Sequence, residues 1–256
     1  MPGSGDGSPG APGEAADSGN RPFIVAIDGP AGAGKSTAAR RLAARLGFAL
    51  VDTGAIYRAV ALAASRAGIA FDDDRRLAIL LPGLRIRFEA PPLDQAAAGQ
   101  KTILGDEDVS LEIREPPMSL GASAVSARPV VRAALLDLQR RLAAAPSHPG
   151  SVLEGRDIGT VVFPDADVKV FLTASPEVRA RRRYDELVAK GQTVSVEQVL
   201  ADQQKRDRDD SQRAVAPLRP APDAFLLDTS DLCADAVVDA LATAVEVRLE
   251  QRGRPV

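Results

Sequence analysis

A glycine-rich run near the start of the chain places a lysine and a serine at the spacing of a phosphate-binding loop. The run Gly29-Pro-Ala-Gly-Ala-Gly-Lys-Ser36 fits the pattern G-x-x-x-x-G-K-[ST]. Its glycines let backbone N–H groups approach phosphate oxygens closely, and a helix that begins there adds the positive end of its dipole. The ammonium group of Lys35 would neutralise charge on the β- and γ-phosphates, and the hydroxyl of Ser36 would bind Mg²⁺. The run therefore predicts a site for a nucleoside triphosphate.

The residues on either side of this run favour the same prediction. The apolar residues 23–27 predict a buried strand, and residues 36–46 predict a helix that ends at Gly47. The alternative is an ordinary glycine-rich turn between a strand and a helix. A complete motif with both flanking elements favours nucleotide binding over that turn.

A second group of charged residues lies far along the chain. Arg179-Ala-Arg-Arg-Arg183 is followed by Lys205-Arg-Asp-Arg208 and by Arg213. Helical spacing places the first, fourth and fifth residues of the first run on one side of a helix. A solvated charged face is the ordinary interpretation of such a run. Because the chain also carries a triphosphate motif, we favour a phosphate clamp, since the planar guanidinium group binds phosphate oxygens in pairs and keeps its charge.

Composition narrows the class of protein. The 256 residues suffice for one α/β core with small excursions, and the net charge of −3 argues against a general nucleic-acid binder. A single cysteine, Cys233, excludes an internal disulfide framework, and its place at a predicted helix start suggests a small buried group. The single histidine, His148, lies in a proline-bounded loop, and we assign it no catalytic role.

The first 21 residues form a separate segment. Residues 1–20 are rich in glycine, proline and serine and contain no leucine, isoleucine, valine or aromatic residue. Such a segment buries too little apolar surface to offset its ordering entropy, so we expect disorder. It has neither the basic and apolar regions of a secretory signal nor the composition of a transit peptide. No apolar run approaches the ~18 residues of a membrane span, so we expect a cytoplasmic protein.

Between residues 22 and 256, short apolar runs alternate with helical stretches. The alternation predicts a parallel sheet with helices on both faces and ligands at the carboxyl ends of the strands. Residues 84–89 and 101–104 instead alternate apolar and polar residues, which predicts a small antiparallel sheet whose loose hairpin connection spans residues 90–99. The expected strands of the main sheet are residues 23–27, 48–51, 151–153, 168–172 and 225–227, and the expected helices include 55–67, 130–142 and 176–189.

Four runs taken together resemble the bacterial cytidylate kinases. They are Ile27-Asp-Gly-Pro-Ala-Gly-Ala-Gly-Lys-Ser-Thr37, Asp52-Thr-Gly-Ala-Ile-Tyr-Arg58, Glu154-Gly-Arg-Asp-Ile-Gly-Thr-Val-Val-Phe-Pro164 and Arg213-Ala-Val-Ala-Pro-Leu218. The first run is common to many families, whereas the other three, in this order and spacing, are specific. The resemblance covers residues 22 to about 250. It implies a P-loop NTPase-type α/β core, a monophosphate-binding excursion at about residues 53–127 that carries the small sheet, and a helical lid at about residues 176–213.

The resemblance also implies an activity and a set of site residues. The family transfers the γ-phosphoryl group of ATP, with Mg²⁺, to CMP or dCMP, and the products are ADP and CDP or dCDP. We expect a monomer with no nucleic-acid or membrane partner. Residues implied in catalysis are Lys35, Arg182 and Arg183, and Ser36 is the implied metal ligand. The implied ATP-binding residues are Gly29, Pro30, Ala31, Gly32, Ala33, Gly34, Lys35, Ser36 and Thr37. The implied CMP-binding residues are Thr53, Arg58, Ser123, Arg132, Arg156, Asp157, Arg206, Asp210 and Arg213.

Other interpretations stay open at this stage. Asp52 or Thr53 could cap the helix at residues 55–67, and Arg156 could pair with Asp157 or with Glu154, a position where the family commonly has Asp. A GTPase would share the phosphate loop but should carry an Asn-Lys-x-Asp run, which is missing from the sequence. A small-molecule kinase such as a shikimate kinase would lack the run at residues 52–58. A non-catalytic nucleotide-binding module is disfavoured by the intact lysine, serine and arginine set.

Overall fold

A parallel sheet forms the centre of the protein, whose computed structural model describes residues 21–89, 100–144 and 148–253. Within these residues the sheet has five strands in the order β2-β6-β1-β7-β8, and every neighbouring pair is parallel. Each strand coincides with an apolar run that the sequence predicts as a strand, which confirms the predicted fold class. The expectations for the first 20 residues and for the linker at residues 90–99 lie outside the described residues. The strands are β1 (Phe23–Asp28), β2 (Ala49–Asp52), β6 (Gly150–Gly155), β7 (Val168–Thr173) and β8 (Phe225–Asp228).

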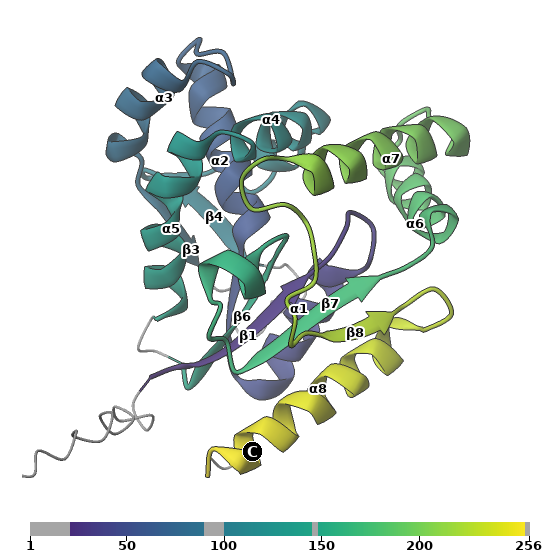
Figure 1. The fold of residues 1–256 in the computed structure, drawn as a ribbon. Coiled ribbons are helices and arrows are strands. Elements are labelled where there is room, and N and C mark those ends of the chain that lie inside the picture. The colour runs from purple at the N-terminus through teal and green to yellow at the C-terminus, as the bar shows by residue number, and fades with distance from the viewer. Residues whose placement is uncertain (1–20, 90–99, 145–147, 254–256) are drawn as a thin grey trace, which may run out of the picture.

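Both faces of the sheet are covered, as Figure 1 shows. Phe23, Val25 and Ile27 of β1 point into one apolar cluster with α1 (Lys35–Leu46) and α8 (Ala234–Gln251). The alternate residues Ile24 and Ala26 point into a second cluster with α5 (Pro129–Ala143) and the short helix η4 (Ile158–Val162). Because β1 is buried on both faces, it is a continuous apolar run instead of an alternating one.

The phosphate loop leaves the sheet at its middle strand. β1 lies between β6 and β7, and the loop follows directly at its carboxyl end. Gly29 begins the loop with a φ of +147°, and a Cβ atom there would lie 2.0 Å from the carbonyl oxygen of Leu172. Only glycine allows the backbone to pass β7 this closely. The loop therefore starts at a point where ligands of open parallel sheets bind.

The predicted helix limits are confirmed to within two residues. α1 begins at Lys35, one residue before the expected start, and is followed by Gly47 at a φ of +64°. α5 begins at Pro129, and α6 (Pro176–Ala189) begins at Pro176, where the ring fixes φ and the missing N–H has no helical partner. α2 (Thr53–Arg66) is capped by the carboxylate of Asp52, which accepts from the backbone N–H of Ala55 at 2.8 Å.

A second core lies beside the sheet. It packs α2, α4 (Pro116–Ser126) and α5 against the short α3 (Asp74–Leu80), the helical turns η1 (Leu81–Gly83) and η3 (Glu112–Arg114), and a small antiparallel sheet. The predicted inserted sheet is thereby confirmed, and its third strand is an addition that the sequence does not predict. Its strands are β3 (Ile86–Glu89), β4 (Lys101–Leu104) and β5 (Glu107–Asp108).

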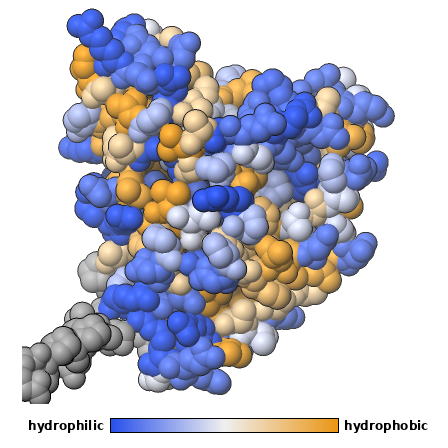
Figure 2. All heavy atoms as spheres, in the orientation of Figure 1, coloured by the Kyte–Doolittle hydropathy of each residue, from blue (hydrophilic) through white to orange (hydrophobic). Residues whose placement is uncertain are grey.

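Two helices rise from the other side of the carboxyl end of the sheet. α6 and α7 (Val196–Gln212) form a hairpin held by Ala180, Leu187 and Val199, and Figure 1 shows it opposite α2 and α4. Figure 2 shows mainly hydrophilic side chains over this hairpin on the visible face. No helix in the described residues has the length and apolar character needed to span a membrane.

One prediction about the C-terminal helix is wrong. Cys233 does mark the start of α8, but its side chain is exposed instead of buried. The reason is its position before the first helical residue, where the extended backbone directs the side chain away from the apolar stripe formed by Val237, Val238 and Leu241.

Candidate active site

A single cleft collects most of the residues that the sequence singles out. It lies at the carboxyl ends of β1, β2 and β6, between α2 and α4 on one side and α7 on the other. From the phosphate loop, Ala31, Gly32, Lys35 and Ser36 line it. All nine residues of the implied CMP set line the same cleft: Thr53, Arg58, Ser123, Arg132, Arg156, Asp157, Arg206, Asp210 and Arg213. The remaining phosphate-loop residues, Gly29, Pro30, Ala33, Gly34 and Thr37, are not among its lining residues in the described part of the chain.

Lys35 lies beneath the phosphate loop. Its ammonium group donates a hydrogen bond to the carbonyl oxygen of Pro30 at 2.7 Å, and only 7% of the residue is exposed. Burial lowers the pKa of Lys35 well below its usual value, and the nearby guanidinium of Arg156 lowers it further. A cation removed from water in this way interacts strongly with an anion that enters the loop.

Ser36 is joined to a buried carboxylate on the neighbouring strand. Its hydroxyl donates to Oε2 of Glu154 at 2.8 Å. The hydroxyl of Thr53 donates to the backbone carbonyl of the same glutamate at 2.6 Å. Burial raises the pKa of Glu154 to about 7, and the charge of Asp52 adds to the rise while Lys35 opposes it. Glu154 therefore lies beside both the phosphate loop and the start of α2, although the sequence left its role open.

Arginines converge on the space across from Lys35. Burial lowers the pKa of Arg206 to about 10, and the charges of Arg156 and Arg58 lower it further, against the opposing effect of Asp210. Among the described residues that line the cleft, three arginines each have a buried guanidinium nitrogen without a hydrogen-bond partner: Nε of Arg58, Nε of Arg206 and Nη2 of Arg213. An unpartnered buried donor is costly, by about 1–3 kcal/mol, and more when it is charged. This part of the cleft therefore favours the binding of a group that accepts hydrogen bonds and carries negative charge.

Carboxylates hold two of these arginines in place. Oδ2 of Asp52 accepts from Arg58 at 2.9 Å, while its other oxygen caps α2. Oδ2 of Asp210 accepts from Nε of Arg156 at 2.9 Å. The structure thus settles the capping alternative in favour of Asp52, and it pairs Arg156 with Asp210 of α7 instead of with Glu154 or Asp157.

Asp157 and Arg132 form the floor of the cleft at its other end. Nη2 of Arg132 donates to Oδ2 of Asp157, and Nη2 of Arg213 lies 3.8 Å from Oδ1. The Arg132 guanidinium also lies 5.8 Å from the ring centre of Tyr57. Burial raises the pKa of Asp157, and the charges of Arg132 and Arg213 oppose this. The result is a buried charged pair with one carboxylate oxygen, Oδ1, outside hydrogen-bond range of Arg213.

Several residues that line the cleft are not among the site residues that the sequence motifs imply. Ser119 and Ser126 lie on α4 at helical spacing with Ser123, so one helix face presents three hydroxyl groups to the cleft. That spacing is visible in the sequence and is the signal that could have found them. The other lining residues outside the implied set are Asp52, Gly54, Tyr57, Ala122, Glu154 and Gly155.

The lid arginines take separate partners. Arg182 donates to the hydroxyl and the carbonyl of Thr229, at 3.0 and 2.6 Å, and Arg183 donates to Glu186 at 2.9 Å. Neither is among the cleft-lining residues in the described part of the chain. Arg179, in contrast, is 5% exposed and donates both to the phosphate-loop carbonyl of Ala31 at 3.1 Å and to Asp207 at 2.6 Å. The face of α6 that the sequence predicts as a clamp thus ties the hairpin to the phosphate loop through Arg179.

A phosphate loop that faces several arginines across one cleft is typical of a P-loop phosphotransferase. The family model described as cytidylate kinase matches residues 25–247. The chain is 53% identical over 230 residues to the cytidylate kinase of Geobacter sulfurreducens, covering 90% of this chain and 95% of that protein. It is 49% identical over 229 residues to the cytidylate kinase of Syntrophotalea carbinolica, covering 90% and 94%. The chain belongs to the cytidylate kinase family, as the four runs indicate.

Proposed function

We propose that ATP binds at the phosphate loop and that CMP or dCMP binds in the arginine pocket, so that the γ-phosphoryl group passes across the cleft. As a member of its family, the protein is an ATP-dependent kinase that converts CMP or dCMP to CDP or dCDP in pyrimidine nucleotide metabolism. One observation carries the division of the cleft: the buried guanidinium nitrogens of Arg58, Arg206 and Arg213 that have no hydrogen-bond partner lie in the same cleft as Lys35. The phosphate and sugar oxygens of a second nucleotide there would satisfy them. In this division, residues 53–127 form the monophosphate-binding excursion and residues 176–213 the lid.

At the donor end, residues 29–37 wrap the ATP phosphates. The backbone N–H groups of the loop and the N-terminus of α1 supply hydrogen bonds, and Lys35 supplies a charge close to the transferring group. Phosphoryl transfer needs positioning and charge stabilisation more than covalent help from the protein. Lys35 is therefore the residue of the donor site to which we assign the largest effect on turnover.

The residues beside the loop fit a magnesium ion. Ser36 and Glu154 offer adjacent oxygen ligands, which suit Mg²⁺, and the buried carboxylate favours a cation. The described residues hold no cluster of three or more acidic, histidine or cysteine side chains that could form an all-protein site. Mg²⁺ commonly needs only one or two protein oxygens beside substrate phosphates and water. When bound, it neutralises charge on the phosphates.

At the acceptor end, arginines bind the acceptor nucleotide and offset its negative charge. Arg58, Arg156 and Arg213 bind the CMP phosphate, and Arg206 with Asp210 lies near the sugar. Two anionic substrates repel one another, and converging guanidinium groups offset that repulsion where the charge is densest. The acceptor phosphate is already an anionic nucleophile at neutral pH, so the reaction needs no separate general base.

The far end of the cleft selects the base. Asp157 accepts a hydrogen bond from the cytosine amino group, and Arg132 and Ser123 complete the base pocket, with Thr53 near the nucleotide. A carboxylate attracts the N4 amino group of cytosine and repels the O4 carbonyl of uracil. The lid residues Arg182 and Arg183 act on closure, when the hairpin excludes water and suppresses ATP hydrolysis.

An assay of ADP release tests this proposal. ATP is supplied with AMP, GMP, UMP, CMP, dCMP or shikimate in turn, and turnover should be highest with CMP and dCMP. A Lys35→Ala variant whose circular dichroism spectrum shows that it is folded should have a turnover lower by about two orders of magnitude or more. The substitution removes a charge next to the transferring group. Near-normal turnover in this variant would contradict the assignment of Lys35 to the ATP site. A preference for shikimate over CMP would contradict CMP as the acceptor substrate.

The assembly and the location are also part of the proposal. We propose a monomer that works in the cytoplasm without a nucleic-acid or membrane partner. The net charge of −3 supports the expected lack of a nucleic-acid partner, because a nucleic-acid binder normally carries an excess of basic residues. Light scattering coupled to gel filtration measures the mass of the particle, and a mass of two chains would overturn the monomer.

A further inference from the structure

Asp28 is a buried carboxylate that the motifs do not account for. It is the last residue of β1 and directly precedes Gly29, the first residue of the phosphate loop. Only 4% of Asp28 is exposed, and it is not among the described residues that line the cleft. Its place next to the loop gives it a role that the motifs do not assign.

Both carboxylate oxygens are used by the backbone of another segment. Oδ1 accepts from the N–H of Ile158 and Oδ2 from the N–H of Gly159, each at 2.8 Å. These two amides immediately follow Asp157, so the carboxylate holds the corner at which the chain leaves β6. The side chain of Asp28 thereby joins two segments that lie 130 residues apart in sequence.

The backbone ladder between β1 and β6 ends just before this corner. Its last pair is Asp28 with Gly155. Beyond it, the phosphate loop and the corner at Arg156 and Asp157 diverge, and the Asp28 side chain supplies the connection that the ladder no longer provides. A carboxylate with two backbone donors makes two charge-assisted hydrogen bonds, which are stronger than neutral ones.

The corner carries two of the acceptor-site groups. Arg156 points to Asp210 of α7, and Asp157 pairs with Arg132 and lies near Arg213. A shift of the corner therefore moves the arginines of the acceptor pocket relative to the phosphate loop. The two reacting groups must be held near one another within a few tenths of an ångström, and a displacement of about 1 Å reduces rates by about 100-fold.

We propose that Asp28 is a positioning residue that fixes the acceptor corner against the phosphate loop and so sets the distance between the acceptor phosphate and the γ-phosphate. This inference rests on the proposed division of the cleft. Asp28 does not line the cleft, and a shift of the corner by a few tenths of an ångström changes the distance between the reacting groups more than it weakens either substrate's binding, so the effect falls mainly on the transfer step. A purely structural contact would instead affect stability and leave the turnover of the folded protein unchanged.

Asp28→Asn tests the inference with little change in size. The amide oxygen accepts from one of the two N–H groups, and the NH₂ group faces the other donor. We expect kcat to fall about 10- to 100-fold while KM for ATP and for CMP each change less than about threefold. The control is Asp167→Asn. The side chain of Asp167 is also buried, at 1% exposed, and accepts from the N–H of Ile24 at 2.8 Å, at the opposite end of β1.

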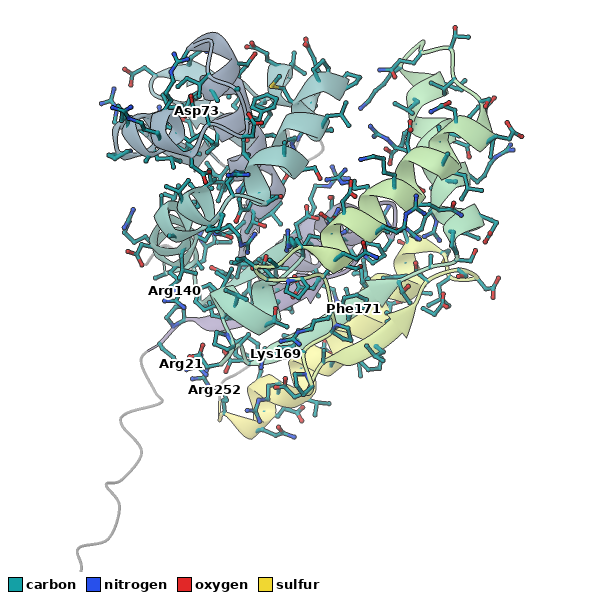
Figure 3. The ribbon with its side chains drawn as sticks, turned by 45° about the horizontal axis from the view of Figure 1, so that its top comes forward. Arg21, Asp73, Arg140, Lys169, Phe171 and Arg252 are labelled. Atoms are coloured by element: carbon teal, nitrogen blue, oxygen red, sulfur yellow. The ribbon has the colours of Figure 1, made fainter. Side chains whose placement is uncertain are left out.

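The control site lies away from the cleft. Asp167 binds Arg21 and Arg252, and Figure 3 shows these two arginines together at the end of the sheet distant from α6 and α7. Asp167→Asn should therefore lower the melting temperature and leave kcat within about twofold of the original. An equal loss of kcat in both variants would overturn the inference.

Gly159→Ala acts on the same contact from the other side. A Cβ atom there would lie 3.5 Å from Oδ2 of Asp28, an ordinary contact, and 3.3 Å from the Lys169 side chain, so that either this side chain or the corner shifts by a few tenths of an ångström. We expect kcat to fall about two- to fivefold with KM unchanged. This variant decides the question if Asp28→Asn does not fold, and unchanged kcat in every folded variant overturns the inference. If the original protein does not phosphorylate CMP at all, the proposed function fails instead.

Discussion

The hydroxyl of Ser36 donates a 2.8 Å hydrogen bond to Glu154, a residue 118 positions further along the chain. The bond connects the first turn of α1 to the carboxyl end of β6, where the acceptor corner begins. Thr53, at the start of α2, binds the backbone carbonyl of the same glutamate. One buried residue therefore contacts both the donor loop and the helix that carries Arg58.

Ser36→Ala tests the metal site. The variant removes the proposed oxygen ligand and leaves Lys35 and the loop backbone in place, so Mg²⁺ should bind more weakly while the fold is kept. We expect the Mg²⁺ concentration that gives half-maximal activity to rise about tenfold at fixed ATP. Ser65→Ala, an exposed serine on α2, is the matched control and should leave the titration unchanged. An unaltered Mg²⁺ requirement in Ser36→Ala would show that the hydroxyl is not a ligand.

The titration of Asp28 should appear in the stability of the protein. Burial raises the pKa of Asp28 from its ordinary 3.8 to about 6, and the charge of Asp157 adds to the rise, while the two backbone N–H groups and Lys35 oppose it. Between those values the folded protein binds more protons than the unfolded chain, so this group's contribution to stability falls as pH rises. Asp28→Asn cannot titrate, so its free energy of unfolding relative to the original should increase from about pH 4 to pH 7. Urea unfolding across that range measures the difference, and a flat or falling difference contradicts the assigned shift.

The lid arginines should affect turnover more than CMP binding. Arg182→Ala removes the contacts to Thr229, whose hydroxyl also lies 3.3 Å from the phosphate-loop carbonyl of Ala33. Arg183→Ala removes a charge that lowers the pKa of Arg206. We expect kcat to fall about tenfold or more in each variant, with KM for CMP changed less than about threefold.

Arg181 on the same helix supplies the control for both lid variants. It is exposed and pairs with Asp185 at 3.3 Å, so Arg181→Ala should leave kcat close to the original value. If Arg182→Ala and Arg183→Ala also leave kcat close to the original value, these two arginines belong to a solvated face and take no part in turnover.

Features that depend on near neighbours could be predicted from the sequence. The glycine after α1 and the prolines at the starts of α5 and α6 act through the local backbone, so their positions were sufficient to place the helix limits. The alternation at residues 84–89 predicted β3 for the same reason, because one wet face imposes a period of two.

Features that depend on the order of the strands and the packing of the helices could not be predicted from the sequence. Asp28 and Ile158 meet because β1 and β6 are neighbours in the sheet, and no local pattern gives the strand order. The helical spacing placed Arg179 and Arg182 on one side of α6 correctly, yet one reaches the phosphate loop and the other Thr229 of the loop after β8. Residue type predicts that an arginine will find an anion or an acceptor, and the fold decides which.

Asp157 offers the sharpest test of base selection, because its two oxygens differ. Asp157 lines the cleft; its Oδ2 accepts from Arg132, whereas its Oδ1 lies 3.8 Å from Arg213, beyond hydrogen-bond range. In Asp157→Asn the amide oxygen must take the Oδ2 position, since an NH₂ group there would face the donating guanidinium. The NH₂ group then occupies the Oδ1 position, where it opposes the amino group of cytosine and donates to O4 of uracil.

The expected result is a change in preference. The ratio of kcat/KM for CMP to that for UMP should shrink about 10- to 100-fold, equivalent to a base contact of roughly 1–3 kcal/mol. Asp210→Asn is the comparison, because that carboxylate pairs with Arg156 and is assigned near the sugar, so it should lower both rates without changing their ratio. If Asp157→Asn also lowers both rates equally, the carboxylate serves to orient Arg132 and does not recognise the base.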